Sequence, residues 1–326
     1  MTTLLSRQDV ERLLQPQECI AAVEDAFRKL AQGTVPLPGM LGMHAGDGSF
    51  HVKAGFLTLD RPYFAAKLNA NFPQNGARHA LPTIQGVVIL SDAANGVPLA
   101  IMDSMSITAL RTAAATAVAA KYLARRDCET ALICGCGGQA AAQLRALLTV
   151  RNPHVVWAYD QDNVRAAGFA ASMERELGID VRPSATLGDA VAASRIVITC
   201  TTSRRFFITQ DMVRPGTFIA AVGADHEEKQ EIEPRLMAAA KVVTDLTAQA
   251  AAIGDLHHAI SAKVMTEDRV HAELGEVVAG KKPGRTRDDE ITIFDSTGTG
   301  LQDVAAAIAT YREALDAQAG TRFTFS

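Results

Sequence analysis

The sequence predicts an α/β protein in which a largely antiparallel sheet with helices precedes a parallel, doubly wound sheet. From Glu129 onward, short apolar segments alternate with helical segments, and this alternation gives a parallel sheet covered on both faces. A glycine turn joins the first of these apolar segments to the first helix. Between residues 50 and 102 the apolar pattern has a period of two, which is typical of antiparallel strands.

The chain begins with predicted helices. Ile20, Val23, Phe27 and Leu30 form one apolar stripe with helical spacing, and Gly33 supplies a stop signal at its end. Alternating strands are predicted over residues 50–56 and 63–71, and residues 85–90 and 97–102 flank Asn95-Gly96, a strong hairpin signal. A helix of small residues follows at roughly 106–123.

The second half is predicted to supply the strands of the parallel sheet. These strand candidates cover residues 130–134, 155–159, 179–182, 195–199, 217–222 and 241–244. Residues 301–319 are predicted to form a helix, followed by a short polar end.

The glycine turn has the layout of a dinucleotide-binding βαβ unit. The strand at 130–134 runs into Gly135-Cys-Gly137-Gly-Gln-Ala140, and a helix from Gln139 to about Val150 leaves the turn. Gly135 permits a tight turn, Gly137 allows close approach of a pyrophosphate, and the small Ala140 lets helix and strand pack. The pyrophosphate would lie on free N–H groups at the helix N-terminus.

Asp160 bears on the identity of the dinucleotide. It ends the next strand, about twenty residues beyond the turn, where a carboxylate accepts hydrogen bonds from ribose hydroxyls and repels a 2′-phosphate. No cation follows until Arg165, so NAD(H) is favoured over NADP(H). The alternative is that Asp160 only caps the following helix.

Composition excludes several classes of function. The chain has 326 residues and a net charge of −4, which argues against a nucleic-acid partner. It has no run of about twenty apolar residues and no signal-peptide pattern, so we expect no membrane segment. The five cysteines lack CxxC spacing and indicate a reduced, cytoplasmic setting. The histidines form no metal-binding pattern, so no metal is predicted.

Two cations are candidate functional residues. Lys67 lies within a strand of small, uncharged residues. It either extends to solvent or faces a cavity, where it could hold a carboxylate or polarise a carbonyl or imine. Arg111 is placed at the start of the small-residue helix, where its charge opposes the helix dipole. A compensating anion is therefore expected there, unless Arg111 simply lies on the surface.

Asp225 is the candidate acid or base. It directly follows the strand at 217–222, and the carboxyl ends of parallel strands line the ligand crevice. Capping of a following helix is the alternative role. Thr201-Thr-Ser203 follows another strand end and could line the same crevice.

The order and spacing of several short motifs resemble the ornithine cyclodeaminase/μ-crystallin family over about residues 35 to 310. The motifs are Lys67, Leu81-Pro-Thr-Ile-Gln-Gly86, Met102-Asp-Ser, Leu110-Arg-Thr-Ala113, Gly135-Cys-Gly, Val222-Gly-Ala-Asp225, Lys229-Gln-Glu231, Gly275-Glu276, Phe294-Asp-Ser-Thr-Gly298 and Gln302-Asp303. Phe50-His-Val-Lys-Ala-Gly55 and Glu290-Ile-Thr-Ile-Phe-Asp-Ser-Thr-Gly298 look most like the branch of NAD-dependent alanine dehydrogenases and imine reductases.

This resemblance implies a Rossmann domain over residues 113–300 and a second α+β domain over 1–112 with 301–326, through which such proteins form homodimers. It places the substrate lysine on Lys67, the carboxylate-binding arginine on Arg111 and the catalytic aspartate on Asp225. The cofactor contacts that it implies are Arg111, Thr112, Gly135, Gly137, Gly138, Gln139, Asp160, Thr201, Thr202, Ser203, Val222, Gly223 and Ser296.

The chain departs from cyclodeaminases at one point. The family's arginine after a Val-Pro pair is missing, because Val35-Pro36 is followed by Leu37. Lys53 or Arg78 could supply the cation instead. We therefore expect an NAD(H)-dependent reductase of 2-imino acids that also runs the reverse amino-acid oxidation. The alternatives are ornithine cyclodeaminase, in which NAD is recycled, and a non-catalytic binding protein like μ-crystallin.

Overall fold

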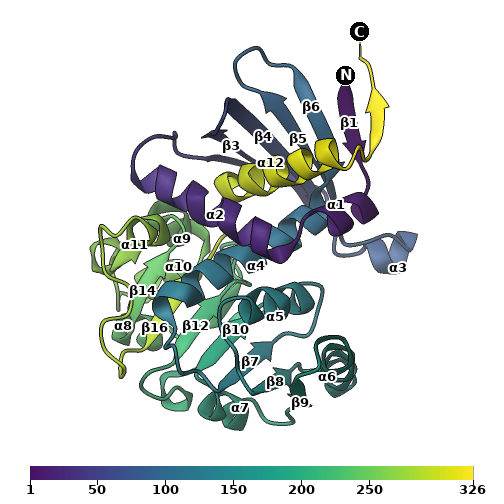
Figure 1. Ribbon diagram of the computed structural model, residues 1–326. Coiled ribbons are helices and arrows are strands. Elements are labelled where there is room, and N and C mark those ends of the chain that lie inside the picture. The colour runs from purple at the N-terminus through teal and green to yellow at the C-terminus, as the bar shows by residue number, and fades with distance from the viewer. Residues whose placement is uncertain (326) are drawn as a thin grey trace. The chain divides into compact units, whose positions relative to one another are not determined.

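The structure is a computed structural model that describes residues 1–325 (Figure 1). Contacts within the chain divide it into two compact units. The mixed-sheet unit comprises Met1–Arg111 and Thr299–Ser326, and the parallel-sheet unit comprises Thr112–Gly298. Each is described by itself.

The mixed-sheet unit contains a seven-stranded sheet in the order β17-β1-β6-β5-β4-β3-β2. Its described neighbours are antiparallel except for the parallel pair β1 and β6. The strands are β1 (Thr2–Leu5), β2 (Gly39–Ala45), β3 (Gly48–Thr58), β4 (Pro62–Asn71), β5 (Ile84–Asp92), β6 (Pro98–Asp103) and β17 (Thr321–Phe323).

Helices cover one face of this sheet. They are α1 (Arg7–Leu13), α2 (Pro16–Ala31), α12 (Gly300–Asp316) and the first part of α4 (Ser104–Leu123), whereas the short α3 (Asn75–His79) has no buried residue. Helix α12 lies across the sheet with α2 beside it (Figure 1), in contact with β3 and β4. The β4 face that carries Tyr63, Ala65 and Lys67 is buried, whereas the alternate residues face the other side of the sheet.

The parallel-sheet unit contains an eight-stranded sheet in the order β15-β14-β16-β12-β10-β7-β8-β9, with every described pairing parallel. The strands are β7 (Thr130–Cys134), β8 (Val155–Tyr159), β9 (Asp180–Pro183), β10 (Ile196–Thr199), β12 (Phe218–Ala221), β14 (Lys241–Thr244), β15 (Ala272–Glu273) and β16 (Thr292–Asp295), with β11 (Arg204–Ile208) and β13 (Gln230–Ile232) forming a separate pair.

The strand order reverses beside β7, because β8 and β9 extend the sheet on one side while β10 starts the other. In such sheets a ligand binds at the carboxyl ends of the strands at the reversal. The helices that connect the strands are α5 (Ala140–Leu148), α6 (Asn163–Leu177), α7 (Leu187–Ala193), α8 (Pro234–Ala239), α9 (Thr247–Ile253), α10 (Asp255–Ser261) and α11 (Leu274–Val278).

The structure confirms the predicted α/β class and places all six predicted strands in the parallel sheet. It corrects several details. The interior strand β16 and the strands β1 and β2 were not predicted, and the polar end of the chain contains β17, which pairs with β1. Helix α4 begins at Ser104, so the prediction that Arg111 opens it is wrong. No helix among the described residues is long and apolar enough to cross a membrane.

Candidate functional site

Lys67 is buried on the helix-covered face of the mixed sheet. Its side chain is 4% exposed, and Nζ donates to Asp303 Oδ1 at 2.8 Å and to Thr108 Oγ1 at 3.2 Å. The register of β4 turns Lys67 to the same side as the buried Tyr63 and Ala65, where α12 presents Asp303. The alternative that Lys67 extends to solvent is therefore wrong.

Arg111 meets the same carboxylate. Its Nε donates to Asp303 Oδ1 at 2.9 Å, and its Nη1 donates to Gln302 Oε1 at 2.9 Å. Arg111 is 5% exposed, which contradicts the alternative of a surface arginine. The expected compensating anion exists: it is Asp303, which lies in the first turn of α12 rather than near the start of α4.

Lys67, Arg111, Asp303 and Gln302 form what we call the Lys67 cluster. Burial alone would raise the pKa of Asp303, but the charges of Lys67 and Arg111 hold it below its ordinary value. Burial, followed by the charge of Arg111, lowers the pKa of Lys67 to about 7. The cluster thus joins an ionised carboxylate to a lysine that titrates near neutral pH.

Several hydrogen-bond donors and acceptors of the Lys67 cluster have no described partner. Among the described residues, Lys67 uses two of its donors and Arg111 bonds through Nε and Nη1. Asp303 Oδ2 and Gln302 Nε2 are buried without a partner. Buried polar atoms of this kind call for an additional group, and the spare cationic donors suit a carboxylate.

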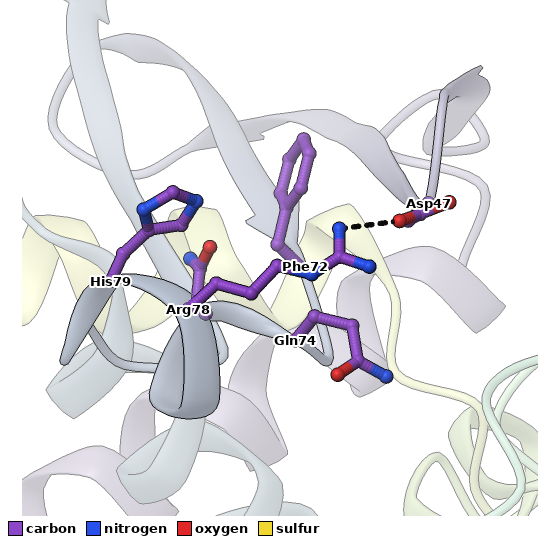
Figure 2. A pocket seen from close by; sticks show the side chains of 6 residues that line it. Asp47, Phe72, Gln74, Arg78 and His79 are labelled. Carbon is purple, nitrogen blue, oxygen red and sulfur yellow. Dashed lines mark hydrogen bonds and ion pairs between the residues drawn. The ribbon is translucent and has the colours of Figure 1, made fainter.

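The two other predicted substrate cations lie in different settings. Lys53 is 9% exposed and pairs directly with Lys67 across β3 and β4, and its charge helps to lower the pKa of Lys67. Arg78, on α3, has a 59% exposed side chain and forms an ion pair with Asp47 at 2.7 Å. Figure 2 shows this pair at a small pocket beside Phe72. No described contact joins Arg78 to the Lys67 cluster.

In the parallel-sheet unit, the predicted glycine turn leads from β7 to α5. Gly135 has φ +93°, and its N–H donates to Tyr159 O at 2.8 Å. A Cβ on Gly137 or Gly138 would meet nothing within 4 Å, which leaves room for a ligand beside the backbone. The Oε1 atom of Gln139 is buried without a partner. These features fit a pyrophosphate held at the start of α5.

Asp160 lies where the second strand of the predicted βαβ unit ends. It accepts hydrogen bonds from Cys136 N and Asp162 N, both at 2.9 Å, and Arg165 approaches it at 3.4 Å. Asp162, not Asp160, caps α6 by accepting from Val164 N and Arg165 N. The alternative that Asp160 is only a helix cap is therefore wrong.

The remaining predicted cofactor residues follow other strand ends, except for Thr112, which is buried within α4. Thr201, Thr202 and Ser203 follow β10, Val222 and Gly223 follow β12, and Ser296 follows β16. Because β10, β12 and β16 are neighbouring parallel strands, these residues gather at one edge of the sheet.

Asp225 is exposed in the loop after β12, and its Oδ1 lies 2.5 Å from Lys229 Nζ. The next element is β13 rather than a helix, so the alternative of helix capping is wrong. An exposed carboxylate beside a cation at this edge of a parallel sheet is suited to proton transfer.

Comparison with known proteins places this chain in a family. The family model of the ornithine cyclodeaminase/mu-crystallin family matches residues 1–318. The chain belongs to this family. The predicted resemblance is thus confirmed.

Three solved structures of other proteins are similar to this chain. An archaeal alanine dehydrogenase dimer with bound NAD is 37% identical, with a TM-score of 0.95 and coverage of 100% of this chain and 99% of that one. Thermococcus litoralis Δ1-pyrroline-2-carboxylate reductase, with NADH and L-proline, is 35% identical, with a TM-score of 0.93 and coverage of 99% and 100%. Paracoccus denitrificans iminosuccinate reductase, with NAD+, is 33% identical, with a TM-score of 0.91 and coverage of 98% of both. Their names agree with the predicted reductase chemistry and cofactor.

The sequence analysis did not predict the roles of three residues. Gln302 and Asp303 were noted only as part of a family motif, and so was the buried Glu231. Asp303 lies in the first turn of α12, where an acidic residue is common, so its sequence position does not distinguish it from an exposed helix-start residue. Glu231 lies in a polar stretch after Glu227, Glu228, Lys229 and Gln230, and nothing in that stretch distinguishes it from an exposed acid.

Proposed function

We propose that the protein is an NAD(H)-dependent reductase of 2-imino acids that also runs the reverse oxidation of L-amino acids. The observation that carries this proposal is the Lys67 cluster, in which two buried cations share the carboxylate of Asp303 and keep further donors. The names of the three relatives support this reaction class.

The mixed-sheet unit would bind the substrate. Arg111 and Lys67 would hold the carboxylate of the imino acid through charge-assisted hydrogen bonds, each contributing about 1.5–3 kcal/mol. Lys53, which pairs with Lys67 across the sheet, would add to the positive potential there. We assign no substrate contact to Arg78 because Asp47 already engages it.

The parallel-sheet unit would bind the cofactor. The turn from Gly135 to Gln139 and the start of α5 would hold the pyrophosphate, and Asp160 would accept hydrogen bonds from the adenosine ribose. Bound NADH would supply the hydride for reduction of the imine. Thr112 and the residues after β10, β12 and β16 would complete the contacts.

Asp225 would transfer the proton at the substrate nitrogen. A carboxylate with a cation beside it can stabilise an iminium and hold or release its proton during reduction. Its partner Lys229 would then help to hold the Asp225 side chain in place before substrate binds. Positioning by Lys67 and Arg111 would contribute orientation as well as affinity.

The substrate class is tested by following NADH absorbance with pyruvate or oxaloacetate, each with and without ammonium, and with Δ1-pyrroline-2-carboxylate. Ammonium-dependent oxidation with a keto acid, or direct oxidation with the cyclic imine, would support the proposal and identify the substrate. If no NADH were consumed, and ornithine released ammonia at catalytic NAD+, the protein would instead be a cyclodeaminase.

We also propose that the protein is a cytoplasmic homodimer. The sheet face opposite α12 exposes apolar side chains, and these are Leu41, Met43, Phe56, Leu68, Val87 and Ile89, each 38–55% exposed. A contiguous apolar sheet face of this kind is typical of an interface. The archaeal relative is described as a dimer. Sedimentation at equilibrium would test this proposal, and a monomer at micromolar concentration would contradict it.

A further inference from the structure

Glu231 lies between two loops that carry proposed cofactor and catalytic residues. Strands β10 and β12 are parallel neighbours. Residues 200–203 follow the end of β10, and residues 222–225 follow the end of β12. Glu231, in β13, is fully buried. Burying a carboxylate is costly unless hydrogen bonds compensate it, so its contacts are informative.

The carboxylate of Glu231 accepts four hydrogen bonds. Its Oε1 accepts from the backbone N–H and the hydroxyl of Thr201, both at 2.7 Å. Its Oε2 accepts from Thr199 Oγ1 at 2.6 Å and from Gly223 N at 2.9 Å. One side chain therefore ties the loop after β10 to the loop after β12.

Gly223 fits closely against this carboxylate. A Cβ at residue 223 would lie 2.4 Å from Glu231 Oε1 and 2.5 Å from Thr201 O. Such distances leave no room for any side chain at this position. The two loops therefore pack tightly around the carboxylate of Glu231. Asp225 lies two residues after Gly223.

A second buried carboxylate anchors the backbone of Glu231. Asp255 Oδ1 accepts from Glu231 N and Ile232 N, both at 2.8 Å. The N–H groups of Asp255 and Leu256 in turn donate to Asp295 at 3.3 and 2.8 Å. Because Asp295 ends β16 and precedes Ser296, the network reaches the third loop of the proposed cofactor site.

We infer that Glu231 is a positioning residue for this reaction: it fixes the Thr201–Ser203 turn and the Val222–Asp225 segment relative to each other. This inference rests on the proposed function. In this role Glu231 touches neither substrate nor cofactor, but it sets the placement of the cofactor contacts at Thr201 and Gly223 and of the proton-transferring Asp225.

Glu231→Gln tests the inference with little change in volume. Each carboxylate oxygen accepts from one backbone N–H, so an amide group in either orientation faces the N–H of Thr201 or Gly223 with a donor. One backbone bond must be lost and that loop must shift. A shift of about 1 Å near the reacting groups reduces turnover by on the order of tenfold to a hundredfold.

The control is Glu290→Gln, which removes a comparable carboxylate from the opposite end of β16. Glu290 accepts from Lys241 Nζ at 2.6 Å and from the N–H and hydroxyl of Thr286 at 2.9 and 2.7 Å. We expect both variants to lower the Tm. Only Glu231→Gln should raise the Kd for NADH, by about tenfold, in titration calorimetry well below the Tm.

Coupling to Asp225 is tested with the double variant Asp225→Asn/Glu231→Gln. If Glu231 acts by placing Asp225, kcat of the double variant should be nearly as high as that of Asp225→Asn alone. If the losses in kcat multiplied, the inferred role toward Asp225 would be overturned, and an unchanged Kd for NADH in Glu231→Gln would overturn the inferred role toward the cofactor. If the unmodified protein reduced none of the imino acids, the proposed function would fail, while the comparison of NADH binding would still decide the role of Glu231 toward the cofactor.

Discussion

Lys67 Nζ lies 2.8 Å from Asp303 Oδ1, and both side chains are at most 4% exposed. The two residues are far apart in sequence and meet because α12 returns across the face of the mixed sheet that carries Lys67. Arg111 donates to the same oxygen. This shared carboxylate holds two cations in place, and under the proposed function both would face an anionic substrate.

Replacing Asp303 with Asn should destabilise the fold and weaken substrate binding. The change leaves Lys67 and Arg111 buried without a compensating charge, which costs about 3–5 kcal/mol when a buried pair is broken. Urea unfolding measures the loss. Asp92→Asn, which removes the partly buried partner of Arg61 at 3.3 Å, is the control and should cost less. Equal losses for the two variants would contradict a special role for Asp303.

The pH dependence of anion binding should report the titration of Lys67. Its pKa is lowered to about 7, so a carboxylate ligand should bind more weakly as pH rises through 7 and Lys67 loses its charge. Pyrrole-2-carboxylate, which has no imine to titrate, is a suitable probe, and its inhibition constant should be measured from pH 6 to 9.

The same titration should shift when Lys53 is replaced by Met. Because the charge of Lys53 contributes to lowering the pKa of Lys67, its removal should move the inflection to higher pH. Lys67→Met should abolish the inflection. An inflection that persists in Lys67→Met would show that another group titrates.

Replacing Asp160 with Ser should increase the use of NADPH. The change removes the carboxylate that opposes a 2′-phosphate, and it frees Arg165, which lies 3.4 Å from Asp160, to bind the phosphate. The ratio of kcat/KM for NADPH over NADH should rise on the order of tenfold or more, the equivalent of one charge-assisted contact. Asp162→Ser preserves a helix-capping side chain but also removes an ion pair of Arg165 at 3.6 Å, so it should raise the ratio less; an equal rise in both variants would refute the assignment.

Asp295 should make folding stability depend on pH. Burial raises its pKa to about 7, so its contribution is complete below the ordinary aspartate pKa and is lost as pH rises to about 7. The difference in unfolding free energy between the unmodified protein and Asp295→Asn should fall by roughly 1 kcal/mol per pH unit between pH 5 and 7. Urea titrations at three pH values would check this, and a difference that is constant with pH would count against a raised pKa.

The sequence predicted the parallel sheet well because its signals are local. Most of the six predicted strands are short apolar runs, and the turn from Gly135 to Ala140 has its own spacing. Strand β16 was missed because Thr292–Asp295 is a short run ending in a buried acid, whose burial depends on distant groups. The strand β17 was missed because it is exposed and pairs only with β1.

The candidate site was predictable only in part, because its contacts join residues that are far apart in the sequence. Lys67 and Arg111 could be singled out as cations in unusual local settings, but their shared partner lies on a helix nearly two hundred residues beyond Arg111. The position of Arg111 within α4 was misjudged because a start signal was overlooked: Asp103 precedes the helix and its Oδ1 accepts from Ser106 N at 2.9 Å. The contacts of Glu231 depend on three loops and cannot be read from its neighbours in the chain.

The most direct test of the central claim is the steady-state kinetics of Lys67→Met, with NADH and the imino acid that the unmodified protein reduces best. We expect kcat/KM for the imino acid to fall on the order of a hundredfold, the equivalent of one charge-assisted contact, while the Kd for NADH stays unchanged. A variant with unchanged kcat/KM would contradict the assignment of Lys67 to the substrate carboxylate.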